Sequence, residues 1–247
     1  MKVVLRKIEP YESKKFSKTL KCQRDYTELL LEITRKLLNN YDAIDKPIPG
    51  QAYIKLVIDK QSRLFVYLSS DKYYSFEYSI SVEVDIFTKA VNSIHTTTGM
   101  NCTPALISNA ISILNEVKSN SIIDVYESRD NEDEDNPIDI EAYMLLEYFW
   151  AHEPCYLRYD YDPQNSKGAL HPLNHLDINI SANGKYKIGL KSRLTPTEFE
   201  DIVNKSTDCY YLLDKLPSHL LDLKACKKRK KMRKKNKLNK YSKWFAR

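Results

Sequence analysis

The spacing of apolar residues divides the first half of the chain into helical and extended segments. Residues 15–40 place leucine, isoleucine and aromatic side chains mostly three and four positions apart, which predicts an amphipathic helix. The prolines of the following segment, DKPIPGQ, exclude further helix. From Ala52 onward the pattern changes to AYIKLVID, SRLFVYLS and YYSFEYSISVEV, which are rich in β-branched and aromatic residues. Polar turns separate these segments, so we expect three antiparallel strands in a meander.

Two Thr-Pro pairs predict helix starts in the second half of the chain. Thr103-Pro104 opens PALISNAISILNEVK, and Thr195-Pro196 opens TPTEFEDIVNK, where Glu198 completes a capping box. Further helices are expected at about 138–150 and 207–223, and the acidic run 129–137 is expected to form an exposed loop.

Three short strands are expected between the helix at about 138–150 and the helix start at Thr195-Pro196, in the segments YLRYDYDP, NHLDINI and KYKIGLKSRL, with a hairpin at 182–184. The order of elements favours an α+β fold, with helices packed on an antiparallel sheet, over alternating β-α units.

The charge pattern separates a body from a tail. Residues 224–247 hold 13 of the 39 Lys and Arg residues and no Asp or Glu, which leaves 26 basic and 33 acidic residues, a formal −7, before them. We therefore expect a single α+β domain over residues 1–223 and a basic Lys-rich C-terminal tail over 224–247.

Lysine clusters interleaved with aromatic residues are typical of segments that neutralise phosphates and stack on bases. Three other readings of the tail remain open: a surface for an acidic protein, a surface for an anionic membrane, and a solvated appendage. We favour nucleic acid, and the residues expected to bind it are Lys227, Lys228, Arg229, Lys230, Lys231, Arg233, Lys234, Lys235 and Trp244.

The cysteines and the apolar runs bear on the compartment. The five cysteines are scattered and form no CxxC pair, so neither a zinc ribbon nor a disulfide framework is expected. The first residues, MKVVLRKIEPYESKK, carry a charge inside what would be the apolar stretch of a signal peptide, and no run of about 18 apolar residues occurs. We expect no membrane segment and a reduced, cytoplasmic protein.

Ionisable residues gather between Tyr156 and Asn179. Because a strand alternates its side chains between two faces, Arg158 and Asp160 share one face of the first strand, and His175 and Asp177 share one face of the second. His171 precedes the second strand. If the two strands pair, imidazole, carboxylate and guanidinium groups meet on one side of a sheet, which is a set suited to acid–base chemistry on a phosphate ester. The alternative is that these polar faces simply meet water.

Two chemical versions of such a site follow. In the metal-free version, one of His171 and His175 deprotonates an attacking 2′-hydroxyl, the other protonates the leaving oxygen, and Arg158 stabilises the phosphorane. In the second version, Asp160, His175 and Asp177 hold a divalent metal ion; no other cofactor is expected.

The pattern Arg-x-Asp, followed by a loop and His-Pro-x-x-His, resembles that of small bacterial proteins from toxin–antitoxin and phage-defence loci, including the TumE-like toxins and related uncharacterised families. The match covers about residues 156–204. The resemblance implies action on RNA or nucleotides through Arg158, Asp160, His171 and His175, and an antitoxin or defence-complex partner. Asp177 stands where such families often have a third histidine.

We therefore expect a toxin- or defence-type enzyme, a nuclease of ribonuclease type that cleaves RNA phosphodiester bonds. The alternative is a non-enzymatic, nucleic-acid-binding or adaptor component of a bacterial defence complex.

Overall fold

The computed structural model describes residues 1–59, 62–116, 121–129, 140–152, 154–180 and 186–204. The chain divides into two compact units, Met1–Val203 and Asn204–Arg247, and the fold described below is that of the first. Four of the features predicted from the sequence lie outside the described residues: most of the acidic run, the hairpin at 182–184, the helix at 207–223, and the basic tail with its boundary near residue 223.

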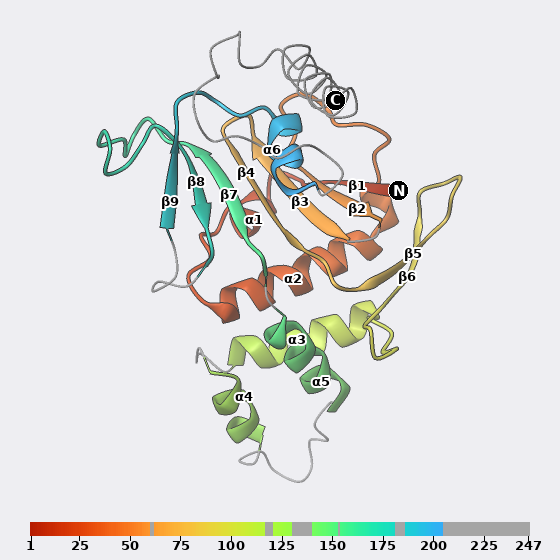
Figure 1. The fold of residues 1–247 in the computed structure, drawn as a ribbon. Helices are drawn as coiled ribbons and strands as arrows, with labels where there is room; N and C mark the ends of the chain where they lie inside the picture. The colour runs from red at the N-terminus through yellow and green to blue at the C-terminus, as the bar shows by residue number, and fades with distance from the viewer. Residues whose placement is uncertain (60–61, 117–120, 130–139, 153, 181–185, 205–247) are drawn as a thin grey trace, which may run out of the picture. The chain divides into compact units, whose positions relative to one another are not determined.

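Among the described residues, seven strands form one sheet in the order β1-β2-β3-β4-β7-β8-β9, and all neighbours are antiparallel. Figure 1 shows this sheet with β9 at one edge and β1 at the other. The strands are β1 (Lys2–Lys7), β2 (Tyr53–Ile58), β3 (Arg63–Ser69), β4 (Lys72–Glu77), β7 (Leu157–Tyr161), β8 (Asn174–Ile178) and β9 (Tyr186–Leu190).

A helical insertion separates β4 from its sheet neighbour β7. It begins with a two-stranded hairpin, β5 (Ser81–Val84) and β6 (Val91–His95), and continues as helices α3 (Pro104–Glu116), α4 (Ile122–Arg129) and α5 (Ile140–Ala151). The remaining helices are α1 (Ser13–Phe16), α2 (Gln23–Leu38), the 3-10 turn η1 (Asn40–Asp42) and α6 (Pro196–Val203). The chain therefore completes the sheet only after the insertion, when β7 pairs with β4.

Helices cover both faces of the sheet (Figure 1). On one face, a register row of Val4, Leu56, Leu64 and Phe76 joins the buried core that includes the apolar side of α2. On the other face, Phe199 of α6 packs against aromatic rings of β3 and β4. Both sides of the central strands are therefore buried, which explains their nearly continuous apolar composition.

The α+β fold predicted from the sequence is confirmed, as is the meander of β2, β3 and β4. The capping box is also confirmed, because the Thr195 amide donates to the Glu198 carboxylate at 2.8 Å and the Glu198 amide donates to Thr195 Oγ1 at 3.2 Å. No helix among the described residues is long and apolar enough to cross a membrane.

Two predicted elements have different bounds in the structure. The segment YYSFEYSISVEV is divided into β4 and β5, and β5 pairs with β6 in the separate hairpin. The helix predicted from residue 15 begins at Gln23, where the Asp25 carboxylate accepts a hydrogen bond from the Lys21 amide at 2.9 Å. Such a contact satisfies a backbone donor ahead of the first turn and favours a helix start there.

Candidate active site

Strands β7 and β8 pair, which is the condition for a shared site, and their register brings the candidate residues together. Arg158 lies opposite Asp177, and Asp160 lies opposite His175. Directly opposed residues of antiparallel strands project to the same face of the sheet, so all four side chains share one face. It is the face that carries Tyr74 of β4, which is opposite Arg158 and donates its hydroxyl to the carbonyl of Phe16 in α1.

Arg158 links the two carboxylates of the cluster. Its Nε donates to Asp160 Oδ2 at 2.6 Å, and its Nη2 donates to Asp177 Oδ2. The Tyr156 hydroxyl is a further partner of the guanidinium, while burial raises the pKa of Tyr156 to about 12. The arginine fork is thus engaged with the protein's own side chains. In this geometry it orients Asp160 and Asp177, and its expected role on a phosphate stays a prediction.

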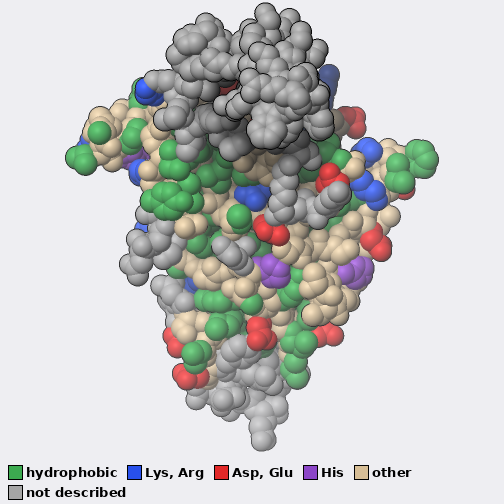
Figure 2. All heavy atoms as spheres, viewed as in Figure 1, with side chains coloured by type: hydrophobic (Ala, Val, Ile, Leu, Met, Phe, Trp, Pro, Cys, Tyr) green, Lys and Arg blue, Asp and Glu red, His purple; other side chains and the backbone are tan. Residues whose placement is uncertain are grey.

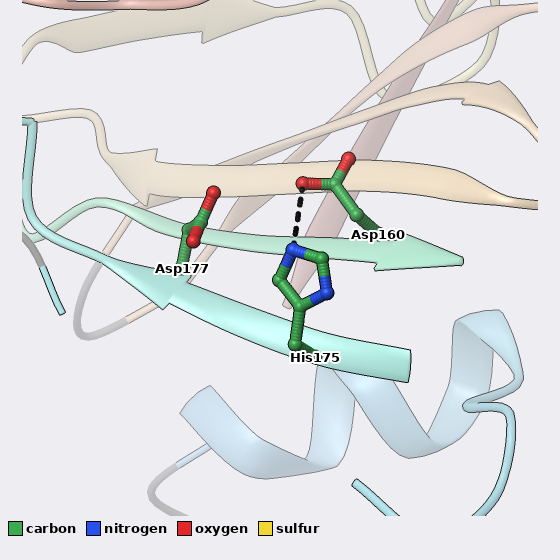
Figure 3. A group of neighbouring side chains, drawn as sticks. All are labelled: Asp160, His175 and Asp177. Atoms are coloured by element: carbon green, nitrogen blue, oxygen red, sulfur yellow. Dashed lines mark ion pairs between the residues drawn. The ribbon is translucent and has the colours of Figure 1, made fainter. Parts of the chain in front are cut away.

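His175 is 1 % exposed, and both of its ring nitrogens have partners. Nδ1 lies 2.8 Å from the carbonyl oxygen of Pro172, an acceptor, so Nδ1 carries the proton and the lone pair of the neutral ring is on Nε2. Burial lowers the pKa of His175 below its ordinary value, and the nearby charge of Lys187 lowers it further. The ring is therefore a neutral acceptor whose Nε2 faces the carboxylates (Figure 3).

Lys187 of β9 completes the cluster, and sequence reasoning missed it. Its Nζ donates to Asp177 Oδ1 at 2.7 Å and lies 2.8 Å from His175 Nε2. The lysine lies opposite Asp177 in the β8–β9 register. The only sequence signal for Lys187 is the alternation in KYKIGLKSRL, which puts it on the face opposite Ile188. The register with β8 is needed to tell that this is the face of the cluster.

Gly189 allows the loop before β8 to reach the cluster. A Cβ at this position would lie 2.9 Å from Cγ of Pro172, closer than carbon atoms pack. Gly189 is opposite His175 in the register. Because Gly189 has no side chain, Pro172 can pack over β9. In this position its carbonyl oxygen accepts a hydrogen bond from Nδ1 of His175.

His171 and Asp162 form the rim of the cluster. Each side chain is 25 % exposed, and His171 Nε2 lies 3.5 Å from Asp162 Oδ2. The His171 ring meets the His175 ring edge to face, with centroids 4.8 Å apart. Although burial opposes it, hydrogen bonds from Asn165 lower the pKa of Asp162. Of the two imidazoles in the candidate site, that of His171 is the more exposed, and the Asp162 carboxylate lies beside it.

The inner residues of the cluster are removed from water. Relative exposures are 8 % for Arg158, 9 % for Asp160 and 0 % for Asp177, so the alternative of a water-facing strand surface is wrong for these residues. Two carboxylates, one guanidinium, one ammonium and a neutral imidazole give no net charge. This balance lets ionic groups remain buried, because each charge has a partner of opposite sign within hydrogen-bonding distance.

Asp160, His175 and Asp177 also have the composition of a metal-binding set. One ligand atom from each lies within 4.8 Å of the others, and all three residues are buried. Figure 3 shows the imidazole of His175 rising from β8 between the two carboxylates, with Asp160 on the neighbouring strand β7. Of the residues expected to be catalytic, the structure thus unites Arg158, Asp160, His175 and Asp177, and it places His171 against them at the rim.

The face of the molecule seen in Figure 2 carries acidic, basic and apolar side chains interspersed, so the described residues offer no broad cationic surface there. The expected nucleic-acid-binding residues of the tail, Lys227 to Trp244, lie outside the described residues. Comparison of the chain with protein-family models, with curated proteins and with solved structures finds no match. The resemblance to toxin and defence families therefore stays a prediction.

Proposed function

We propose that this chain is a nuclease that cleaves a phosphodiester bond at the rim of the cluster on β7, β8 and β9, with RNA as the favoured substrate. The observation that carries the proposal is the contact between His171, which is partly exposed, and His175, which is buried, neutral and hydrogen-bonded to Lys187. A partly exposed proton-transferring group and a cation in the same cluster are what attack on a phosphate ester requires.

The geometry favours His171 as the group that exchanges a proton with the substrate. A mechanism with two histidines on opposite sides of a phosphate needs space between the rings, whereas the centroids of the His171 and His175 rings are only 4.8 Å apart. His175 Nε2 is also engaged by Lys187. We assign His171 to removal of the proton from the 2′-hydroxyl, whose oxygen bonds to phosphorus while the bond to the 5′-oxygen breaks and that oxygen takes a proton from water. We assign the cationic position now held by Lys187 Nζ to stabilisation of the phosphorane.

RNA is favoured over other phosphodiesters on two grounds. The 2′-hydroxyl supplies an internal nucleophile, so cleavage needs no positioned water. The basic segment 224–247 carries 13 Lys and Arg residues with aromatic residues near its end, a composition suited to single-stranded nucleic acid. The toxin- or defence-type setting follows from the resemblance alone and belongs to the same proposal, together with an antitoxin or complex partner.

Replacement of His171 tests the proposal. We expect His171→Ala to slow cleavage of a single-stranded RNA by the full chain by at least about 100-fold, the usual contribution of general acid–base catalysis. Because the side chain is at the rim, the fold should be retained, which circular dichroism checks. His95→Ala is the control, since His95 lies on β6 in the separate hairpin. Full activity in His171→Ala, or no cleavage of RNA by the wild-type chain, would contradict the proposal.

A second candidate function is a non-enzymatic, nucleic-acid-binding adaptor. The specific observation in its favour is that every charge of the inner cluster has a partner inside it, as in a buried network that only stabilises the sheet. It predicts that RNA binds without being cut and that His171→Ala changes neither binding nor stability appreciably. A binding assay run beside the cleavage assay separates the two candidates.

A further inference from the structure

The ammonium group of Lys187 lies beside side chains of the kind that coordinate metal ions. Nζ is 2.8 Å from Nε2 of His175 and 2.7 Å from Oδ1 of Asp177. Oδ2 of Asp160 is 3.7 Å from the same Nε2. Two ligands of one ion, each about 2.1 Å from it, are about 3 to 3.5 Å apart. The three donor atoms lie within 4.8 Å of one another, so the carboxylates have to close on the ring by about 1 to 2 Å to share an ion.

The surrounding contacts hold these donors in the orientation that a metal requires. A metal-binding histidine normally donates its second ring N–H to a carbonyl or carboxylate, and here Nδ1 of His175 meets the carbonyl of Pro172. Ligating carboxylates are normally held by further hydrogen bonds, and here Arg158 binds Asp160 and Asp177 together. The neutral ring needs to lose no proton before Nε2 can coordinate.

Lys187 differs from the other members of the cluster in its freedom to leave. It belongs to β9, the edge strand of the sheet, and its side chain is 32 % exposed, whereas the side chain of Asp177 is fully buried. A flexible lysine stem can carry its ammonium to solvent, with loss of the contacts to Asp177 and His175 that a metal ion would replace. The inner carboxylates would then retain Arg158 and need a second cation.

We propose that Asp160, His175 and Asp177 form a site for a divalent transition-metal ion, of the Mn²⁺ or Zn²⁺ class, which Lys187 fills with its ammonium until the metal displaces it. One nitrogen and two carboxylate oxygens suit these ions, and three protein ligands leave coordination positions for water or a phosphate oxygen. As a role in catalysis the inference rests on the nuclease function proposed above, where the metal would take the cationic position beside His175.

The test uses the competition between ammonium and metal in the full chain without nucleic acid. Mn²⁺ binding is followed by the loss of the electron paramagnetic resonance signal of the free ion. We expect wild type to bind Mn²⁺ at one site and Lys187→Met to bind it at least about tenfold more tightly, because the competing charge a few ångströms away is gone. Lys46→Met is the matched control, an exposed lysine near β1 at the opposite edge of the sheet, and should bind like wild type.

Ligand variants establish where the ion binds, since the Asp and Glu residues of the acidic run 129–137 are an alternative place for a divalent cation. Asp177→Asn and Asp160→Asn, each combined with Lys187→Met, should lose the gain in affinity. The inference is overturned if Lys187→Met binds Mn²⁺ no more tightly than wild type, or if tight binding survives both asparagine substitutions.

A measurement on the wild-type chain keeps the test independent of the stability of the lysine variant. Mn²⁺ at millimolar concentration should raise the melting temperature of wild type but not of Asp160→Asn, because a ligand that binds the folded state stabilises it by mass action. No shift in wild type would also overturn the inference.

The outcomes for the metal and for the nuclease are separable. A chain that binds Mn²⁺ at this site but cuts no RNA refutes the nuclease proposal and leaves the metal site standing. A chain that cuts RNA in a His171-dependent manner in the presence of EDTA, and binds no Mn²⁺, refutes the metal site and leaves the nuclease standing.

Discussion

At the scale of single residues, Arg158 decides whether the cluster can exist. Its guanidinium reaches Asp160 through Nε and Asp177 through Nη2, from a position opposite Asp177 in the register. A planar fork with several donors can hold two carboxylates in fixed orientations, which a lysine in its place could not do. Arg158 therefore positions the two carboxylates in this structure.

Loss of Arg158 should be costly to stability. We expect Arg158→Met to lower the free energy of unfolding by about 3 to 5 kcal/mol, because it leaves two buried carboxylates with Lys187 as their remaining cation. Urea denaturation measures the loss. Arg193→Met is the control, since Arg193 is largely exposed where it pairs with Asp71, and its replacement should change stability little.

A charge-balanced partner variant sharpens this prediction. Arg158→Met combined with Asp177→Asn removes one charge of each sign and should recover part of the lost stability. If Arg158→Met alone is as stable as wild type, the buried ion-pair network does not have the energetic role inferred for it.

At the scale of elements, β9 and the loop that precedes β8 act together on the site. β9 contributes both Lys187, which reaches Asp177, and Gly189, over which Pro172 packs. The loop returns the Pro172 carbonyl to His175 and places His171 at the rim. The lack of a side chain at Gly189 in β9 thus determines the tautomer of His175 in the neighbouring strand β8.

Gly189→Ala should disturb this arrangement. The added methyl group would lie 2.9 Å from Pro172 Cγ, and a proline ring held in a loop cannot turn away as a flexible side chain would. We expect a loss of about 1 to 3 kcal/mol in the free energy of unfolding, the usual effect of overpacking. The ¹⁵N resonances of the His175 ring should also change as its hydrogen bond to Pro172 lengthens.

The double variant Gly189→Ala, Pro172→Ala provides the check on that reasoning. Removal of the ring should relieve the clash, so the double variant should be less destabilised than the sum of the two single changes. Strict additivity would show that the alanine acts elsewhere.

At the scale of the whole molecule, charge is distributed unevenly along the sequence. Residues 1–223 have a formal charge of −7, and the +6 of the full chain therefore comes from residues 224–247. The view in Figure 2 shows both signs of charge interspersed on the described body. Any affinity for nucleic acid should consequently depend on the C-terminal segment far more than on the sheet.

Deletion of residues 224–247 tests this division. We expect the truncated chain to bind single-stranded RNA at least about 100-fold more weakly near 0.1 M salt, and to lose most of the salt dependence of binding, because lysine contacts to phosphates release counterions. Fluorescence anisotropy over a salt series measures both quantities. Unchanged affinity after truncation would place the binding surface on the body instead.

The sequence by itself determined the α+β class, the meander and the capping box at Thr195. It also determined that Arg158 and Asp160 share one face of their strand, as His175 and Asp177 share one face of theirs. Each of these follows from a local rule, namely side-chain periodicity or helix capping, that acts over a few residues. Only the tertiary structure decided that Lys187 joins the cluster, that Pro172 fixes the ring of His175, and that Arg158 binds the carboxylates of Asp160 and Asp177. Those facts depend on strand register and on the packing of a loop over Gly189, and contacts between residues distant in sequence have no signature in any short segment.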